Sequence, residues 1–312
     1  MRRILGLFLL GVALAQGGTY VVRPGDTLFS IARRFGTRVE VLARLNRLAD
    51  PDRIRAGTVL KLPVPPAPAG VGLDPYPLVQ GRPVWVRLPA GTAWVALDGV
   101  RARVHRGRAL LPVAATAAVG RHPLVLSGGR RATVFVAPGG YPTRDLTLPT
   151  GKGRLFDRAT IARERRAILA ACRKGPPEPL WRRPWRWPLT RPVVSAPFGE
   201  RRRYDGRPGG YHAGLDLAAP AGTPVRAAAP GRVALVARFR VRGNAVVLVH
   251  GAGVCAVYQH LKGAAVRPGA SVRPGALLGW VGTTGLSTGP HLHLEVRLLG
   301  LPQDPRFFLE AR

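Results

Sequence analysis

The stretch from Gly289 to Val296 alternates polar and apolar residues, and it constrains the fold more than any other part of the chain. Such alternation is typical of a strand with one buried face. Because successive side chains of a strand point to opposite faces, His291, His293 and Glu295 should share one face. Two imidazoles placed in this way can hold a metal, or one can bind metal while the other transfers protons. They can equally be an ordinary polar face, and the motif alone does not decide.

The size and charge of the chain limit the classes of protein to consider. A length of 312 residues predicts two or three domains. The formal net charge of +32 favours contact with polyanions such as nucleic acid, anionic lipid or acidic wall polymers. The arginines that supply it are spread along the chain without a long basic block. We therefore expect no specific nucleic-acid binding, but we allow electrostatic association with anionic envelope polymers.

The N-terminus predicts export. Residues 1–15 contain two arginines, an apolar run and a small-x-small cleavage site, as a secretory signal does. The apolar run is too short to span a membrane in the mature protein, so no transmembrane segment is expected there. The mature protein should work in the periplasm, the cell wall or outside the cell. This compartment permits a disulfide between Cys172 and Cys255, but their apolar periodic surroundings favour two buried free thiols.

Residues 19–63 predict a small βααβ module. A short strand precedes two amphipathic helices and a returning strand. Asp26 is expected to cap the first helix, and Thr37 with Glu40 should form a capping box on the second. A module of this size is feasible as a domain.

This module resembles the LysM family. The matching residues are Tyr20-Val21-Val22-Arg23-Pro24-Gly25-Asp26-Thr27-Leu28-Phe29-Ser30-Ile31-Ala32, Leu45-Asn46 and Ala56-Gly57-Thr58-Val59-Leu60-Lys61-Leu62-Pro63. The resemblance implies binding to N-acetylglucosamine-containing glycans such as peptidoglycan or chitin. It places the glycan contacts at Gly25, Asp26, Thr27 and Ile54, although Asp26 can equally be a helix cap and nothing more.

The rest of the chain divides at proline-rich and glycine-rich segments and is mainly β. Residues 64–73 form a stiff proline-rich linker. Residues 74–148 contain short alternating strands, which predict a β-sandwich that resembles the immunoglobulin-like domain preceding the catalytic domain in some bacterial envelope peptidases. Residues 149–188 hold a helix capped by Asp157 and a linker whose tryptophans should pin it to a domain surface. Residues 189–312 read as an antiparallel β domain.

A second polar cluster, His212-Ala213-Gly214-Leu215-Asp216, places a histidine and a carboxylate four residues apart. In a straight strand they would lie about 13 Å apart, so a shared metal requires a bend, for which Gly214 supplies the freedom. These two side chains and a histidine of the 289–296 strand would give the three N/O ligands of a catalytic zinc site with an open fourth position. The His-Glu-x-x-His and Gly-x-Ser-x-Gly motifs are absent, which indicates a different hydrolase architecture.

The C-terminal region resembles the lysostaphin-type (LytM-like) zinc endopeptidases, which cut peptidoglycan cross-links. The motifs that carry the resemblance include Ser195-Ala196-Pro197-Phe198-Gly199, His212-x-x-x-Asp216, Val249-His250-Gly251, Tyr258-Gln259-His260-Leu261 and Gly289-Pro290-His291-Leu292-His293. The resemblance implies that His212, Asp216 and His293 bind one Zn²⁺. It also implies that His260 and His291 carry out the acid–base and transition-state work, and it leaves open which histidine does which.

Other polar residues of this region are expected to have supporting roles. Asn244 is expected to contact substrate. Tyr204 and Tyr211, in the loop before the first metal motif, are candidates to donate to the oxyanion or to form the walls of the groove. His250 should make a structural hydrogen bond near the site, and Glu295 should be a supporting or exposed residue rather than a ligand.

These features predict an exported zinc-dependent endopeptidase that hydrolyses the peptide cross-links of peptidoglycan and reaches the wall through its LysM module. The alternative is a non-catalytic LysM-containing envelope protein that activates a cell-wall amidase. The presence of all three ligands and both catalytic histidines disfavours it. A nucleic-acid-binding protein is a third class, against which the export signal argues.

Overall fold

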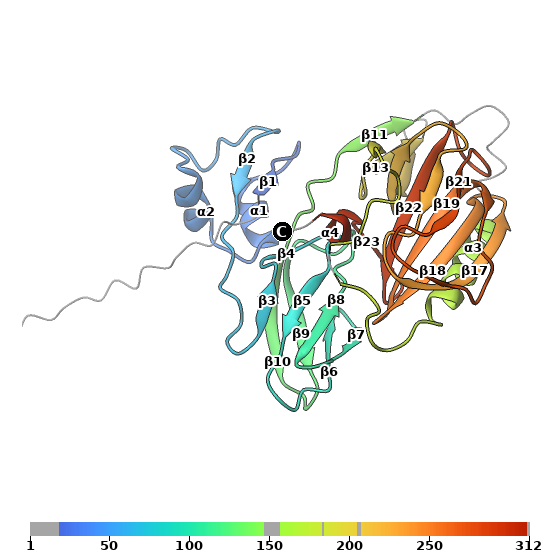
Figure 1. Ribbon diagram of the computed structural model, residues 1–312. Coiled ribbons are helices and arrows are strands. Elements are labelled where there is room, and N and C mark those ends of the chain that lie inside the picture. Colours follow the sequence, from blue (N-terminus) through green and yellow to red (C-terminus); the bar gives the residue numbers. More distant parts are fainter. Residues whose placement is uncertain (1–18, 147–156, 183, 205–206, 311–312) are drawn as a thin grey trace, which may run out of the picture.

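The computed structural model describes residues 19–146, 157–182, 184–204 and 207–310 (Figure 1). The chain is mainly β and consists of several units, as predicted. The predicted signal segment, 1–15, lies outside the described residues. Within those residues, no helix has the length and apolarity needed to cross a membrane. The domain boundaries drawn from the sequence stay predictions, so each unit is defined here by its sheet.

The first unit is a two-stranded antiparallel sheet covered by two helices. Its elements are β1 (Thr19–Val21), α1 (Leu28–Arg34), α2 (Val39–Asn46) and β2 (Val59–Lys61). Apolar side chains at helical spacing, among them Leu28, Ile31 and Leu42, are buried against the sheet. Phe135 and Ala137, from the next unit, complete this core. The first unit is therefore packed onto the second and does not hang from a free linker.

Both helix caps of this unit differ from the prediction. Thr27, not Asp26, caps α1, and Thr27 and Ser30 form a reciprocal capping box. The Asp26 carboxylate is engaged by the Tyr20 hydroxyl at 2.5 Å and the Arg23 N–H at 2.8 Å, so it stabilises the preceding turn. Residue 37 donates its N–H to Ala32 O at the end of α1. It therefore belongs to that turn, and α2 begins after Arg38 without a side-chain cap.

The second unit consists of two sheets packed face to face, as predicted. One sheet has the order β3-β5-β8 and the other β4-β10-β9-β6-β7. The strands are β3 (Gly72–Asp74), β4 (Leu78–Val79), β5 (Val84–Arg87), β6 (Trp94–Leu97), β7 (Val100–Arg103), β8 (Arg108–Leu111), β9 (Gly120–Leu126) and β10 (Arg131–Ala137). Apolar residues of both sheets, such as Val84 and Val86 of β5, are buried between them.

The third unit is a large antiparallel sheet with the order β12-β15-β22-β19-β18-β17-β20. Its strands are β12 (Val193–Ala196), β15 (Leu215–Ala218), β17 (Gly231–Phe239), β18 (Gly243–Gly251), β19 (Val254–Ala264), β20 (Ser271–Val272) and β22 (His291–Leu298). β21 (Leu277–Val281) pairs with β19 and with β16 (Pro224–Arg226). β23 (Leu301–Gln303) pairs antiparallel with β22 and precedes α4 (Arg306–Leu309). β11 (Thr143–Leu146), β13 (Arg201–Tyr204) and β14 (Arg207–Tyr211) form a separate small sheet.

Helix α3 (Arg158–Cys172) is capped by Asp157, as predicted, and packs against β17, β18 and β19 of the large sheet (Figure 1). The prediction of free thiols is wrong, because Cys172 and Cys255 form a disulfide with their Cα atoms 5.4 Å apart. Both cysteines belong to one buried cluster with Ile168. The apolar periodicity correctly indicated that both cysteines are buried. The packing of the C-terminal end of α3 on β19 is what places them next to each other.

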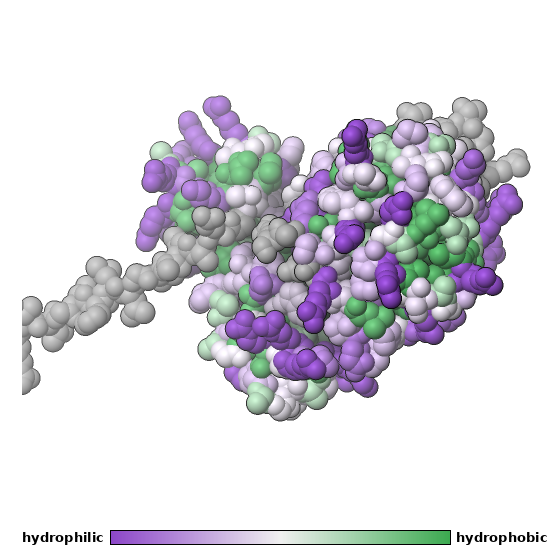
Figure 2. Space-filling model, viewed as in Figure 1, coloured by the Kyte–Doolittle hydropathy of each residue, from purple (hydrophilic) through white to green (hydrophobic). Residues whose placement is uncertain are grey.

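The junction between the second and third units is aromatic. Trp181 and Trp185 are buried, and each packs against Phe308, with ring centroids 5.5 and 4.7 Å apart. Trp181 also contacts Trp85 of the sandwich at 6.2 Å. The expectation that these tryptophans pin the linker to a domain surface is confirmed. Figure 2 shows hydrophilic residues scattered over the visible face, in keeping with dispersed charge and not with one basic block.

Candidate active site

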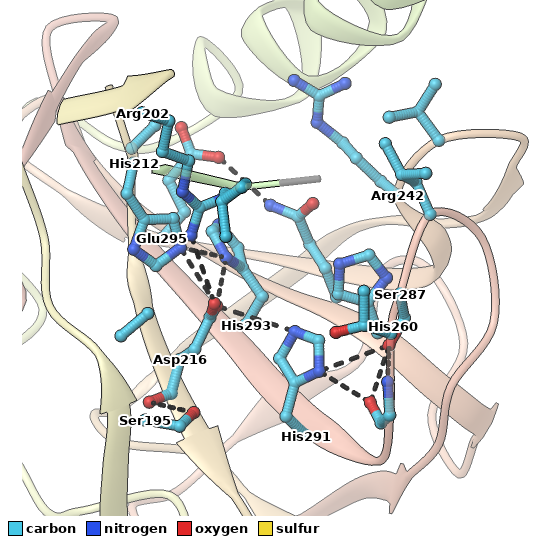
Figure 3. A pocket seen from close by; sticks show the side chains of 18 of the residues that line it. Ser195, Arg202, His212, Asp216, Arg242, His260, Ser287, His291, His293 and Glu295 are labelled. Atoms are coloured by element: carbon cyan, nitrogen blue, oxygen red, sulfur yellow. Dashed lines mark hydrogen bonds and ion pairs between the residues drawn. The ribbon is translucent and has the colours of Figure 1, made fainter. Parts of the chain in front are cut away.

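The polar cluster forms where β15 and β22 lie side by side. In their antiparallel register Asp216 is directly opposite His293, and Ala218 is opposite His291. Asp216 Oδ1 lies 2.7 Å from His293 Nδ1. The chain bends at Gly214, as predicted, so His212 Nε2 reaches 3.1 Å from Asp216 Oδ1 and 3.0 Å from His293 Nδ1. The fold therefore brings together all three predicted metal ligands (Figure 3).

Gly214 is required at this bend because of space. A Cβ at this position would lie 2.5 Å from His293 Nε2 and 2.6 Å from Leu294 O. Its φ angle is not in the left-handed region, so the backbone conformation by itself would accept another residue. The absent side chain is what lets the His293 ring lie against the 212–216 segment.

The donor set fits a zinc ion. Two imidazole nitrogens and one carboxylate oxygen are the ligands of many catalytic zinc sites. Their mutual distances of 2.7–3.1 Å approach the separation of about 3.3 Å between ligands of a tetrahedral zinc. His212 donates its Nδ1–H to Pro197 O at 2.8 Å, which leaves Nε2 with a lone pair toward the cluster. Arg202 lies 3.6 Å from Asp216 Oδ2, so the other carboxylate oxygen is also held.

Two further histidines lie next to this cluster. His291 Nε2 is 3.7 Å from Asp216 Oδ1, while its Nδ1 faces Gly289 O at 2.9 Å. The His260 ring lies 4.9 Å from that of His291, and its Nδ1 faces Thr284 O at 2.8 Å. Donation of each Nδ1–H to a carbonyl leaves each Nε2 unprotonated in the neutral ring. The predicted catalytic pair is thus adjacent to the predicted ligands, with a basic nitrogen free on each ring.

Burial determines the charge of the site. Burial lowers the pKa of His260 to about 3, and the neighbouring His293 ring acts in the same direction. Burial also lowers the pKa of His293, although the Asp216 carboxylate opposes this. Burial by itself would raise the pKa of Asp216, but its close contacts with the His212 and His293 rings hold that pKa well below its usual range. At neutral pH His260 and His293 are therefore neutral and Asp216 is a carboxylate, and neutral imidazole and carboxylate are the forms that metal ligation requires.

These groups line a cleft of about 570 Å³ (Figure 3). One wall comes from the large sheet, and the others come from segments outside the predicted catalytic motifs. Arg144 and Leu146 of β11, Ile161 of α3 and Arg242 of the β17–β18 turn all face the cleft. Sequence reasoning missed these lining residues and Arg202, because long-range packing brings them to the site and no motif spacing marks them.

The remaining predicted residues are placed as follows. Tyr211 lines the cleft, whereas the side chain of Tyr204 lies outside the described residues. Asn244 is not among the lining residues, and its amide donates to Leu261 O and to the next carbonyl, each at 3.1 Å. His250 is fully buried, bonds Pro230 O at 2.8 Å and packs on a tryptophan, away from the cleft.

Glu295 lines the cleft as a buried, supporting residue. Its carboxylate is 2% exposed and forms an ion pair with Arg297 at 2.5 Å. It also accepts a hydrogen bond from Gln259 at 3.1 Å. Gln259 in turn pairs with His293 across β19 and β22. Glu295 is therefore tied into the sheet and is not part of the ligand group.

Three of the four predicted glycan contacts of the first unit, Gly25, Asp26 and Thr27, lie at the entry to α1. Gly25 has a left-handed φ of 83°, which the turn before Thr27 requires. The side chains of Asp26 and Thr27 make the local bonds described above. Ile54 is partly buried against the core of the unit.

Comparison with known proteins identifies two of these units. Residues 20–63 match the LysM domain, and residues 210–305 match peptidase family M23. The chain contains a LysM domain and an M23 domain. The resemblances to the LysM family and to the lysostaphin-type peptidases are confirmed.

Two curated relatives are similar to part of this chain. The DD-carboxypeptidase/endopeptidase Mpg of Neisseria meningitidis serogroup B is 45% identical over 118 residues, which cover 38% of this chain and 27% of that protein. The peptidoglycan DD-endopeptidase ShyA of Vibrio cholerae serotype O1 is 41% identical over 91 residues, 29% of this chain and 21% of that protein. This chain thus matches only about a quarter of the length of these relatives.

One solved structure matches more of the chain. A peptidase M23 from Pseudomonas aeruginosa superposes with a TM-score of 0.60 at 27% identity. The match covers 76% of this chain and 96% of that one. The similarity in fold therefore extends well beyond the M23 domain.

Proposed function

We propose that this protein is an exported, zinc-dependent endopeptidase that hydrolyses peptide cross-links of peptidoglycan and is targeted to the cell wall by its LysM domain. The observation that carries the proposal is the group His212, Asp216 and His293 beside His260 and His291, in one cleft of an M23 domain. The names of the relatives, which include peptidoglycan DD-endopeptidases, support the substrate class.

His212, Asp216 and His293 would hold one Zn²⁺. Bound zinc would supply Lewis acidity that polarises the scissile carbonyl and acidifies a water molecule. His291 is the better placed to accept the proton of the attacking water, since its Nε2 lies 3.7 Å from Asp216 Oδ1 and its side chain is 16% exposed. His260, more deeply buried and neutral, would orient the reacting groups from the far side of His291. The protonated base would then pass its proton to the leaving amine.

The charge of the cleft favours an acidic peptide as substrate. Arg144 and Arg202 both line it, and both contact Glu200, a glutamate that is only 2% exposed. Their guanidinium groups provide more donors than this one carboxylate can use. A substrate carboxylate that enters the cleft would find these donors already in position.

A zymogram of the purified protein on cell-wall material, run with and without a chelator, tests the proposal. Lysis that a chelator abolishes and that added zinc restores is the expected result. No lysis in either lane would favour the amidase activator instead. Mass spectrometry of the released fragments would identify the bond that is cut. Export is tested separately by N-terminal sequencing of the protein from the envelope, which should begin near residue 16.

A further inference from the structure

Helix α3 carries a buried glutamate that is bonded to the turn between β17 and β18. Glu164 is 5% exposed. Its Oε1 accepts the backbone N–H of Val241 at 2.9 Å. Its Oε2 accepts the backbone N–H of Arg242 at 3.3 Å and Nη1 of the same arginine at 3.1 Å. One carboxylate thus satisfies two peptide groups of the turn and its charged side chain.

The backbone carbonyls of the same turn accept hydrogen bonds from two residues that line the cleft. Arg242 O accepts the backbone N–H of His260 at 3.0 Å, and Val241 O accepts that of Leu286 at 2.7 Å. The segment that ends at Leu286 includes Thr284, whose carbonyl faces Nδ1 of His260. The backbone of His260 and the segment that orients its ring are therefore both bonded to the turn that Glu164 holds.

His260 needs this support. Its φ of 61° is left-handed, a conformation that non-glycine residues rarely adopt. The pairing of β18 and β19 shifts register at this point, since Asn244 pairs with Leu261 but Val246 pairs with Tyr258. Such a bulge redirects a side chain out of the regular strand pattern. The N–H of His260 is consequently bonded to the turn and not to a residue within β18.

We propose that Glu164 is a positioning residue for His260, acting through the β17–β18 turn. This inference rests on the proposed peptidase function, in which His260 acts on the substrate. Glu164 lies outside residues 210–305, so the M23 match does not contain it. The Cys172–Cys255 disulfide joins the same helix to β19, the strand of His260, and so keeps α3 in register with the site.

Glu164→Ala tests the proposal, but it leaves the partly buried Arg242 side chain without its partner. The change is therefore also made in the Arg242→Ala background, where no unpaired charge arises and the two backbone N–H groups still lose their acceptor. Against the Arg242→Ala reference, we expect kcat to fall about tenfold or more with zinc content unchanged, because displacement of a catalytic group by a fraction of an ångström to about 1 Å has such effects. Glu178→Ala, which removes the same charge from an exposed site, is the matched control and should keep wild-type kcat.

Hydrogen exchange gives a readout that does not depend on catalysis. In the Arg242→Ala background, Glu164→Ala should speed exchange of the His260 amide and leave the Val247 amide, in the middle of β18, unchanged. An unaltered kcat would overturn the proposal. A lower kcat with unchanged exchange at His260 would overturn the route through the turn. If the parent protein proves inactive on cell walls, the proposed function fails, while the exchange experiment still tests the positioning role.

Discussion

Replacement of Gly214 by alanine tests the geometry of the proposed metal site without touching a ligand. The added Cβ would lie 2.5 Å from His293 Nε2, whereas ordinary contacts begin near 3.4 Å, so the ring must move by about 0.9 Å. It would also lie 2.6 Å from Leu294 O, a backbone atom of β22 that cannot rotate away. Since β15 pairs with β22 through Leu215 and Leu294, the two strands must separate locally.

The expected effect falls mainly on metal binding. Disturbance of the groups that orient a ligand typically costs 10- to 100-fold in metal affinity, and we expect Gly214→Ala to fall in this range, about 1.4–2.8 kcal/mol. Overpacking should also lower the free energy of unfolding by about 1–3 kcal/mol. Because the φ of Gly214 is not left-handed, no further backbone penalty is expected.

Zinc affinity is measured by competition with a chromogenic chelator, and stability by urea unfolding of the metal-free protein. Gly263→Ala is the matched control, because a Cβ there meets no atom within 4 Å and its φ is also outside the left-handed region. The control should keep its zinc affinity. Wild-type affinity in Gly214→Ala would refute the reasoning, since it would mean that the His293 ring does not need the space beside this glycine.

Three further predictions concern the ligands, the buried histidine and the disulfide. His293→Ala should abolish both zinc binding and wall hydrolysis, whereas His291→Ala should keep zinc, measured by atomic emission, and lose at least about 100-fold in kcat; equal loss of metal in both would contradict the division of roles. Burial lowers the pKa of His250 from 6.5 to about 4, so between these values the unfolded chain binds the proton and the folded chain does not, and stability must fall as the pH falls. From pH 8 to pH 5 this one group should cost about 2 kcal/mol in urea unfolding, a loss that His250→Asn should remove; an unchanged pH dependence in the variant would show that the group is not responsible. Replacement of both Cys172 and Cys255 by alanine should lower the free energy of unfolding by up to about 4.5 kcal/mol, from loop closure over a separation of 83 residues, and a stability equal to wild type would contradict the pairing.

Local patterns in the sequence were sufficient for the elements that carry the site. The alternation from 289 to 296 predicted the strand β22 and the shared face of His291 and His293, because the two-residue period of a strand fixes side-chain direction. The glycine between His212 and Asp216 correctly predicted the bend that joins them. Spacing and residue type were enough here, since each inference concerned residues only a few positions apart in the sequence.

Other features were decided only by tertiary packing. The cap of α1 differs because the Asp26 carboxylate is bonded to the Tyr20 hydroxyl, and the cap of α2 differs because Thr37 belongs to the turn that ends α1. The disulfide depends on where α3 lies on β19.

The same distinction applies within the site itself. The sequence by itself indicated which residue types could carry the proposed chemistry, and it placed His291 and His293 on one face of a strand. Only the tertiary structure decided that Asp216 stands opposite His293, that Gly214 leaves room for the ring, and that Glu164 of a separate helix holds the turn behind His260. The physical reason is that strand register, close packing and the pairing of buried charges depend on residues that are distant in the sequence. Local patterns carry no information about these partners.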